Sequence, residues 1–175
     1  DELEEVKRRL DEVNKRVEDE HRRVEEELRK VLEDVAREHE EVIKELERVL
    51  EKVRRAKGGD EEVLRRLTKK VEDISRDSKR LLDELREDIK RIIEDSKRLL
   101  EDNRRHSKEI KDTIDRDKKS DEARKLVKEN ERRVEETVRR SEKLVRDAMK
   151  KAKDTVRRSA ELVKELMDRV ERVVR

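Results

Sequence analysis

An eighteen-residue repeat runs through the chain and constrains its fold more than any other feature of the sequence. In the C-terminal part, Leu126, Leu144 and Leu162 recur at this spacing, and a valine follows each of them. An α-helix has 3.6 residues per turn, so eighteen residues make five full turns and the same face returns without angular drift. Heptads impose a left-handed supercoil and eleven-residue repeats a right-handed one. The period therefore predicts long helices that are straight and essentially untwisted.

The composition agrees with an all-α protein. Charged residues make up 59% of the chain, and there is no aromatic residue, no proline and no cysteine. High charge with few apolar residues is often a sign of disorder, but here the apolar residues recur at helical spacing from end to end. We expect three helices, at about residues 1–57, 60–116 and 120–175.

Two short connections join these predicted helices. The two glycines, Gly58 and Gly59, precede Asp60, which we expect to be the N-cap of the second helix. Ser120 is the expected N-cap of the third helix, although no glycine marks the end of the second. One apolar stripe per helix then predicts a long antiparallel up-down-up three-helix bundle that spans residues 1–175 as a single domain.

Polar residues interrupt the apolar stripes at positions that follow the repeat. With tight turns, a histidine of the first helix faces a serine of the second, which faces a serine of the third, and this occurs twice. These two predicted layers consist of His21, Ser96 and Ser141, and of His39, Ser78 and Ser159. A third polar zone is predicted where Asn14 meets Asn103 and Ser107 meets Asn130, with His106 nearby.

Polar side chains at one level of a bundle can satisfy one another. A buried polar group without a partner costs about 1–3 kcal/mol, so a network also disfavours a slipped register. The alternative is that each serine bonds its own helix backbone and each histidine lies at the boundary of the core. Because His21 and His39 share the repeat and both face serine, we favour the network for them; His106 lies beside the stripe.

The sequence indicates no enzyme, metal site or cofactor. A His–Ser pair in acyl transfer also needs an orienting acid, an oxyanion hole and a pocket, which continuous helices do not offer. His21 and His39 are too far apart to share an ion, and no second histidine or cysteine lies three or four residues from either. We also expect no small-molecule substrate.

Charge and composition also argue against two classes of partner. The net charge is +2 and no aromatic side chain is present for stacking, so we expect no nucleic-acid binding. No apolar run approaches the length of a membrane span, and no Trp or Phe is available for a membrane surface. We expect a soluble chain without a targeting segment, and the sequence does not specify its compartment.

At the level of class, the chain resembles de novo designed, parametrically generated helical bundles with buried histidine-containing hydrogen-bond networks. The resemblance rests on the eighteen-residue period, the helix starts KGGDEE and KSDEAR, and the Glu/Lys/Arg surface over a Leu/Val/Ile core. It implies a rigid building block in which buried histidines make the bundle or its assembly sensitive to acid. Natural spectrin-like spacers share the outline, but they usually carry aromatics and heptads.

Two hypotheses of function follow. The first is a structural scaffold without catalytic activity, whose buried His–Ser and Asn groups make it acid-sensitive. The alternative is a pH-responsive subunit of a self-assembling oligomer or filament, or three helices completed by a partner helix. The wide apolar stripe of the third helix, with Met149, Ala160 and Met167, gives some support to the alternative, but these flanks could equally face one another in a closed bundle.

Overall fold

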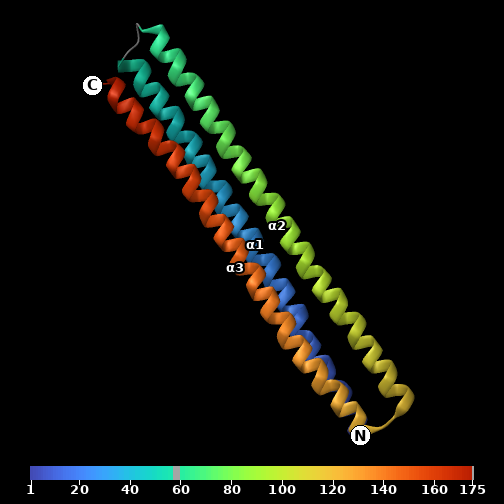
Figure 1. Cartoon of the computed structure of the whole chain (residues 1–175). Coiled ribbons are helices and arrows are strands. Elements are labelled where there is room, and N and C mark those ends of the chain that lie inside the picture. Colours follow the sequence, from blue (N-terminus) through green and yellow to red (C-terminus); the bar gives the residue numbers. More distant parts are fainter. Residues whose placement is uncertain (57–59, 175) are drawn as a thin grey trace. The chain divides into compact units, whose positions relative to one another are not determined.

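The computed structural model describes residues 1–56 and 60–174, and over these ranges the chain forms three α-helices (Figure 1). The helices are α1 (Glu2–Ala56), α2 (Glu61–Asp117) and α3 (Ser120–Val174). They confirm the predicted all-α three-helix fold. The predicted glycine turn at Gly58 and Gly59, and residue 175, lie outside the described ranges.

Contacts within the chain divide it into two compact units, and each helix contributes one segment to both. Unit 1 consists of Asp1–Arg29 and Ile89–Ala148, and unit 2 of Lys30–Asp88 and Met149–Arg175. Each unit has its own apolar core. The single bundle expected over 1–175 stays a prediction.

In unit 1, aliphatic side chains from all three helices form two buried clusters. One cluster consists of Val6, Leu10, Ile110, Ile114, Ala123 and Val127. The other consists of Val13, Val17, Leu100 and Val134. Ion pairs cross from α1 to α2, from Lys7 to Asp115 and from Asp11 to Lys111, so the two segments run antiparallel.

In unit 2, one buried cluster again draws on all three helices. Its members are Leu46, Val49, Val53, Leu67, Val71, Ile74, Leu166 and Val170. These positions follow the apolar stripes of the sequence, and full burial of one aliphatic side chain contributes about 1.5–3 kcal/mol. The hydrophobic stripes therefore account for the way in which the helices meet in each unit.

Asp60 caps the start of α2. Its Oδ1 accepts a hydrogen bond from the Val63 N–H at 3.3 Å, and its carbonyl oxygen accepts one from the Leu64 N–H at 3.2 Å. A side chain that accepts from the third residue of a helix satisfies an N–H that has no partner within the helix. The predicted N-cap at Asp60 is therefore confirmed.

The second connection differs from the prediction by one residue. Lys118 has φ of 50°, and its N–H donates to the Ile114 carbonyl at 3.0 Å, which is the left-handed arrangement that ends many helices. The carbonyl of Lys119 accepts from the Ala123 N–H at 3.0 Å, so Lys119 takes the cap position and Ser120 is the first helical residue. The predicted N-cap at Ser120 was wrong because the left-handed Lys118 reverses the chain early enough for α3 to begin there.

Candidate functional site

The first candidate site is a chain of hydrogen bonds across the three helices of unit 2. His39 Nδ1 in α1 lies 2.9 Å from Ser78 Oγ in α2, and Ser78 Oγ lies 3.3 Å from Ser159 Oγ in α3. Ser78 is 1% exposed and Ser159 is 9% exposed, while the His39 ring is half-buried. All three residues fall on the apolar stripes, which is why helix packing brings their short polar groups together. These two bonds join all three residues of the predicted layer.

The surroundings of His39 favour its neutral form. Burial is the largest cause that lowers the pKa of His39, and the positive charge of Arg86 lowers it further. The negative charges of Asp83 and Glu40 act in the opposite direction, and Lys79 adds a smaller lowering effect. The result is a pKa of His39 below its usual value of 6.5. A neutral imidazole has one N–H and one acceptor nitrogen, which suits a bond to a serine hydroxyl.

The second candidate site lies in unit 1, one repeat earlier in α1. His21 Nδ1 lies 2.9 Å from Ser96 Oγ, and Nε2 lies 3.1 Å from Glu25 Oε1. In the neutral ring, the Nε2–H donates to the carboxylate and Nδ1 accepts from the serine hydroxyl. Ser141 is buried at 4% exposure, but among the described residues no hydrogen bond joins it to Ser96. The structure therefore brings together two of the three residues predicted for this layer and adds a carboxylate.

Glu25 was missed by the sequence reasoning, although the sequence carries a signal for it. Residues four apart on a helix face the same side, so Glu25 lies one turn beyond His21. The equivalent position one repeat later holds Ile43, which packs against the apolar core of unit 2. The two histidines thus share a serine partner and differ in what lies near the rest of the ring.

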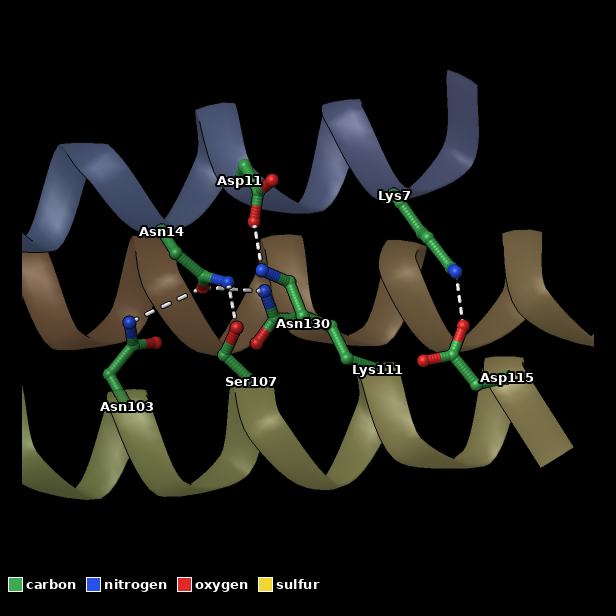
Figure 2. Close-up of polar contacts among 8 residues, drawn as sticks. All are labelled: Lys7, Asp11, Asn14, Asn103, Ser107, Lys111, Asp115 and Asn130. Atoms are coloured by element: carbon green, nitrogen blue, oxygen red, sulfur yellow. Dashed lines mark hydrogen bonds and ion pairs between the residues drawn. The ribbon is translucent and has the colours of Figure 1, made fainter. Parts of the chain in front are cut away.

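The third candidate site is a cluster of amides in unit 1, in which Asn14 joins all three helices (Figure 2). Asn14 Nδ2 donates to Ser107 Oγ in α2. Asn14 Oδ1 accepts from Asn103 Nδ2 in α2 at 3.3 Å and from Asn130 Nδ2 in α3 at 2.9 Å. The sequence predicted Asn14 opposite Asn103 and Ser107 opposite Asn130. In the structure all three partners bond to Asn14.

Two acceptors of this cluster are left over. The Oδ1 atoms of Asn103 and Asn130 are buried and have no hydrogen-bond partner among the described residues. Asn130 is fully buried and Asn103 is 4% exposed. A buried polar atom without a partner costs about 1–3 kcal/mol. The cluster is therefore only partly satisfied by its own side chains.

His106 lies apart from the amide cluster. Its Nδ1 is 3.3 Å from Arg133 Nη1, which donates because a guanidinium has no acceptor. Burial and then the charge of Arg133 lower the pKa of His106, while Glu109 and Glu129 act in the opposite direction. Arg133 is a second partner that the sequence reasoning missed. It lies on α3, so a pattern within one helix could not show it.

The geometry of these sites limits the chemistry that they can perform. Ser78 and Ser96 are 1% and 2% exposed, and both lie in the middle of α2, where backbone N–H groups bond within the helix. Within residues 1–56 and 60–174, no group of three or more His, Cys, Asp or Glu side chains could hold a metal ion. No helix in the described ranges combines the length and the apolar character needed to cross a membrane.

Comparisons with known proteins do not add a family to this description. Family models, curated sequences and solved structures were compared with the chain, and none matches it.

Proposed function

We propose that the chain is a structural scaffold of the designed helical-bundle class, without catalytic activity, and that acid destabilises its folded state through His39. The observation that carries the proposal is the bond of the half-buried His39 ring to Ser78, which in turn bonds to Ser159. These contacts place a titratable ring at the junction of three helices, with neighbours that favour its neutral form.

The direction of the pH effect follows from proton linkage. The pKa of His39 in the folded chain is lowered below 6.5, so the unfolded chain binds a proton first as the pH falls. Stability is therefore full above about pH 6.5 and declines as the pH drops from there through the folded pKa. His106 contributes in the same direction, because its pKa is also lowered.

The burial of the serines within continuous helices supports the proposed absence of catalysis. A nucleophilic serine must reach a substrate and needs N–H donors aimed at the developing oxyanion. Ser96 bonds to His21, which in turn contacts the Glu25 carboxylate, yet Ser96 is only 2% exposed and lies within a continuous helix. The most economical role for the buried polar groups is to favour one register of the helices.

The experiment compares urea unfolding of the wild type and His39→Asn, followed by circular dichroism at about pH 7.5 and about pH 5. Asparagine can still bond to a serine but does not titrate. The variant therefore keeps a polar side chain at this position and removes only the titration. We expect the wild type to lose more stability between the two pH values than the variant. Equal losses would contradict the role of His39.

Light scattering at the same pH values separates this proposal from an assembly switch. A constant mass near 21.3 kDa agrees with a scaffold whose histidine acts on internal stability. A larger species at neutral pH that dissociates in acid would instead support the alternative of a pH-responsive assembly subunit. An increase in the rate of ester hydrolysis that depends on Ser96 would contradict the non-catalytic part.

A further inference from the structure

Unit 2 contains a partly enclosed cavity of about 250 Å³, and His39 and Ser78 are part of its lining. The expectation that continuous helices offer no pocket beside a His–Ser pair is therefore wrong for this pair. All three helices contribute to its wall, and most of the wall is aliphatic. The side chains that matter for the argument are Val35, Val42, Leu82, Val156 and Ala160, together with His39. Val35 and Leu82 are buried, Val42 and Val156 are half-buried, and Ala160 is exposed, so the cavity reaches from the core to the surface near α3.

The eighteen-residue repeat explains why space is left here. Val35, Val42, Leu82 and Val156 recur as the same residue types in unit 1. Their counterparts there are Val17, Val24, Leu100 and Val138. Two positions at the surface differ, because unit 1 has Glu142 where unit 2 has Ala160, and Arg23 where unit 2 has Glu41. The difference between the units therefore lies at the mouth.

In unit 1 these two positions carry opposite charges that can extend toward each other. Arg23 Nη2 donates to Glu20 Oε1 at 2.8 Å, and this bond raises the pKa of Arg23, with a smaller contribution from the charge of Glu142. In unit 2, Glu38, Glu41 and Ala160 occupy the positions that Glu20, Arg23 and Glu142 hold in unit 1. Two carboxylates repel each other and a methyl group is too short to reach across, so these side chains do not cover the space.

The wall of the cavity selects a type of ligand. Ser78 Oγ bonds to both His39 Nδ1 and Ser159 Oγ, so these three polar groups of the wall do not require a polar ligand. Apart from Thr155, the remaining wall inside the mouth is aliphatic, and Glu38 and Glu41 at the mouth disfavour an anion. An apolar cavity of about 150 Å³ is enough to bind benzene, while sites for drug-sized ligands begin near 300 Å³. The space of about 250 Å³ lies between these values.

We propose that the cavity lined by Val35, Val42, Leu82, Val156 and Ala160 binds small neutral aromatic molecules, of the size of toluene or indole. This inference does not depend on the acid response of His39. A ligand of this class removes its own apolar surface and that of the cavity wall from water, and needs no new hydrogen bond.

The test is a toluene titration of the full chain, followed by carbon–proton NMR of the valine and leucine methyl groups. We expect saturable shifts at the four lining positions of unit 2. The matched positions of unit 1, which have the same residue types, are expected to shift much less. Shifts of equal size in both units, or shifts that do not saturate, would mean unspecific partitioning and would overturn the proposal.

The control variant transfers the surface residues of unit 1 to unit 2. Glu41→Arg combined with Ala160→Glu places an arginine and a glutamate at the mouth, and both positions are exposed, so the fold is expected to persist. We expect toluene binding to weaken by about tenfold or more, a change of about 1.4 kcal/mol. Ala160→Gln blocks the mouth without a charge and should give the same direction.

Unchanged affinity in both variants would overturn the proposal. Sedimentation of the wild type and the double variant measures their oligomeric states and tests whether a second copy of the chain fills the cavity instead. A wild-type oligomer that becomes a monomer in the double variant would assign the cavity to a second copy of the chain and overturn the small-molecule site.

Discussion

His21 Nε2 lies 3.1 Å from Glu25 Oε1 in unit 1, and among the described residues this contact has no equivalent at His39. Ile43 occupies the position that the repeat assigns to Glu25. Both histidines bond a serine of α2 through Nδ1 at 2.9 Å. The chain therefore contains two versions of one site that differ by a carboxylate, which makes the effect of that carboxylate measurable.

Ile43→Glu is expected to raise the pKa of His39. The new carboxylate would lie one turn from the ring, as Glu25 does at His21, and a nearby negative charge favours the imidazolium. A higher folded pKa reduces the difference in proton binding between the folded and unfolded chains, so the loss of stability in acid becomes smaller. An NMR titration of the His39 ring measures the pKa.

Ile43→Gln serves as the control for this substitution. It removes the same apolar contact as Ile43→Glu, at a cost of about 1 kcal/mol for a partly buried side chain, but adds no charge. If the two variants gave the same His39 titration, the carboxylate would have no part in the effect.

Lys118→Gly is expected to stabilise unit 1. Lys118 has φ of 50°, a region that costs a side-chain-bearing residue about 1–2 kcal/mol and glycine almost nothing. Glycine also has more conformational entropy in the unfolded chain, which offsets part of this gain. We therefore expect a net increase of about 0.5–1 kcal/mol in the free energy of urea unfolding. Lys118→Ala keeps the penalty and should give no gain. A gain of equal size in the alanine variant would assign the effect to the lysine side chain.

Asn14→Leu is expected to destabilise unit 1 by about 2–3 kcal/mol. The substitution leaves the buried amide groups of Asn103 and Asn130 without their shared acceptor. The repeat itself supplies leucine at the equivalent positions, Leu32 and Leu50. Urea unfolding at neutral pH measures the change.

The complementary variant replaces the whole amide cluster with apolar residues. It combines Asn14→Leu, Asn103→Leu, Ser107→Ile and Asn130→Leu, each with a counterpart elsewhere in the repeat. Removing all partners together is much less costly than removing one, so this variant should be more stable than Asn14→Leu alone. A quadruple variant less stable than the single one would show that the amides contribute net stability.

Arg133→Met is expected to raise the pKa of His106 toward 6.5. The substitution removes the positive charge and the donor that together favour the neutral ring. Because Arg133 is exposed, the change in stability at neutral pH should stay within about 0.5 kcal/mol. Arg132→Met, at the adjacent exposed position, is the control, and an equal shift of His106 in that variant would exclude the specific contact.

The helical fold could be predicted from the sequence because one period controls every stripe. The same period placed His39 opposite Ser78 and His21 opposite Ser96, since short connections leave little freedom in how antiparallel helices align. Asp60 was predictable for a local reason, because an acidic residue after glycines is a preferred cap.

The features that could not be predicted depend on three-dimensional detail at the ends and edges of the stripes. Lys118 adopts a left-handed conformation, although such positions are usually occupied by glycine or asparagine, so the sequence did not predict it. Arg133 reaches His106 from another helix, and long side chains have many rotamers, so the repeat does not fix their contacts. The serines of the two layers occupy equivalent positions, yet Ser159 bonds to Ser78 while Ser141 does not bond to Ser96.

The contacts of Asn14 Oδ1 also have a kinetic consequence. Its two donors, on Asn103 and Asn130, are 89 and 116 residues away along the chain. Both bonds exist together only after the chain has reversed twice, and contacts between distant residues carry the largest loop-closure entropy. If they form after the rate-limiting step, weakening them changes how fast the native state opens and leaves the speed of folding nearly unchanged. The oxygen of one amide would then set a lifetime for the folded form of unit 1.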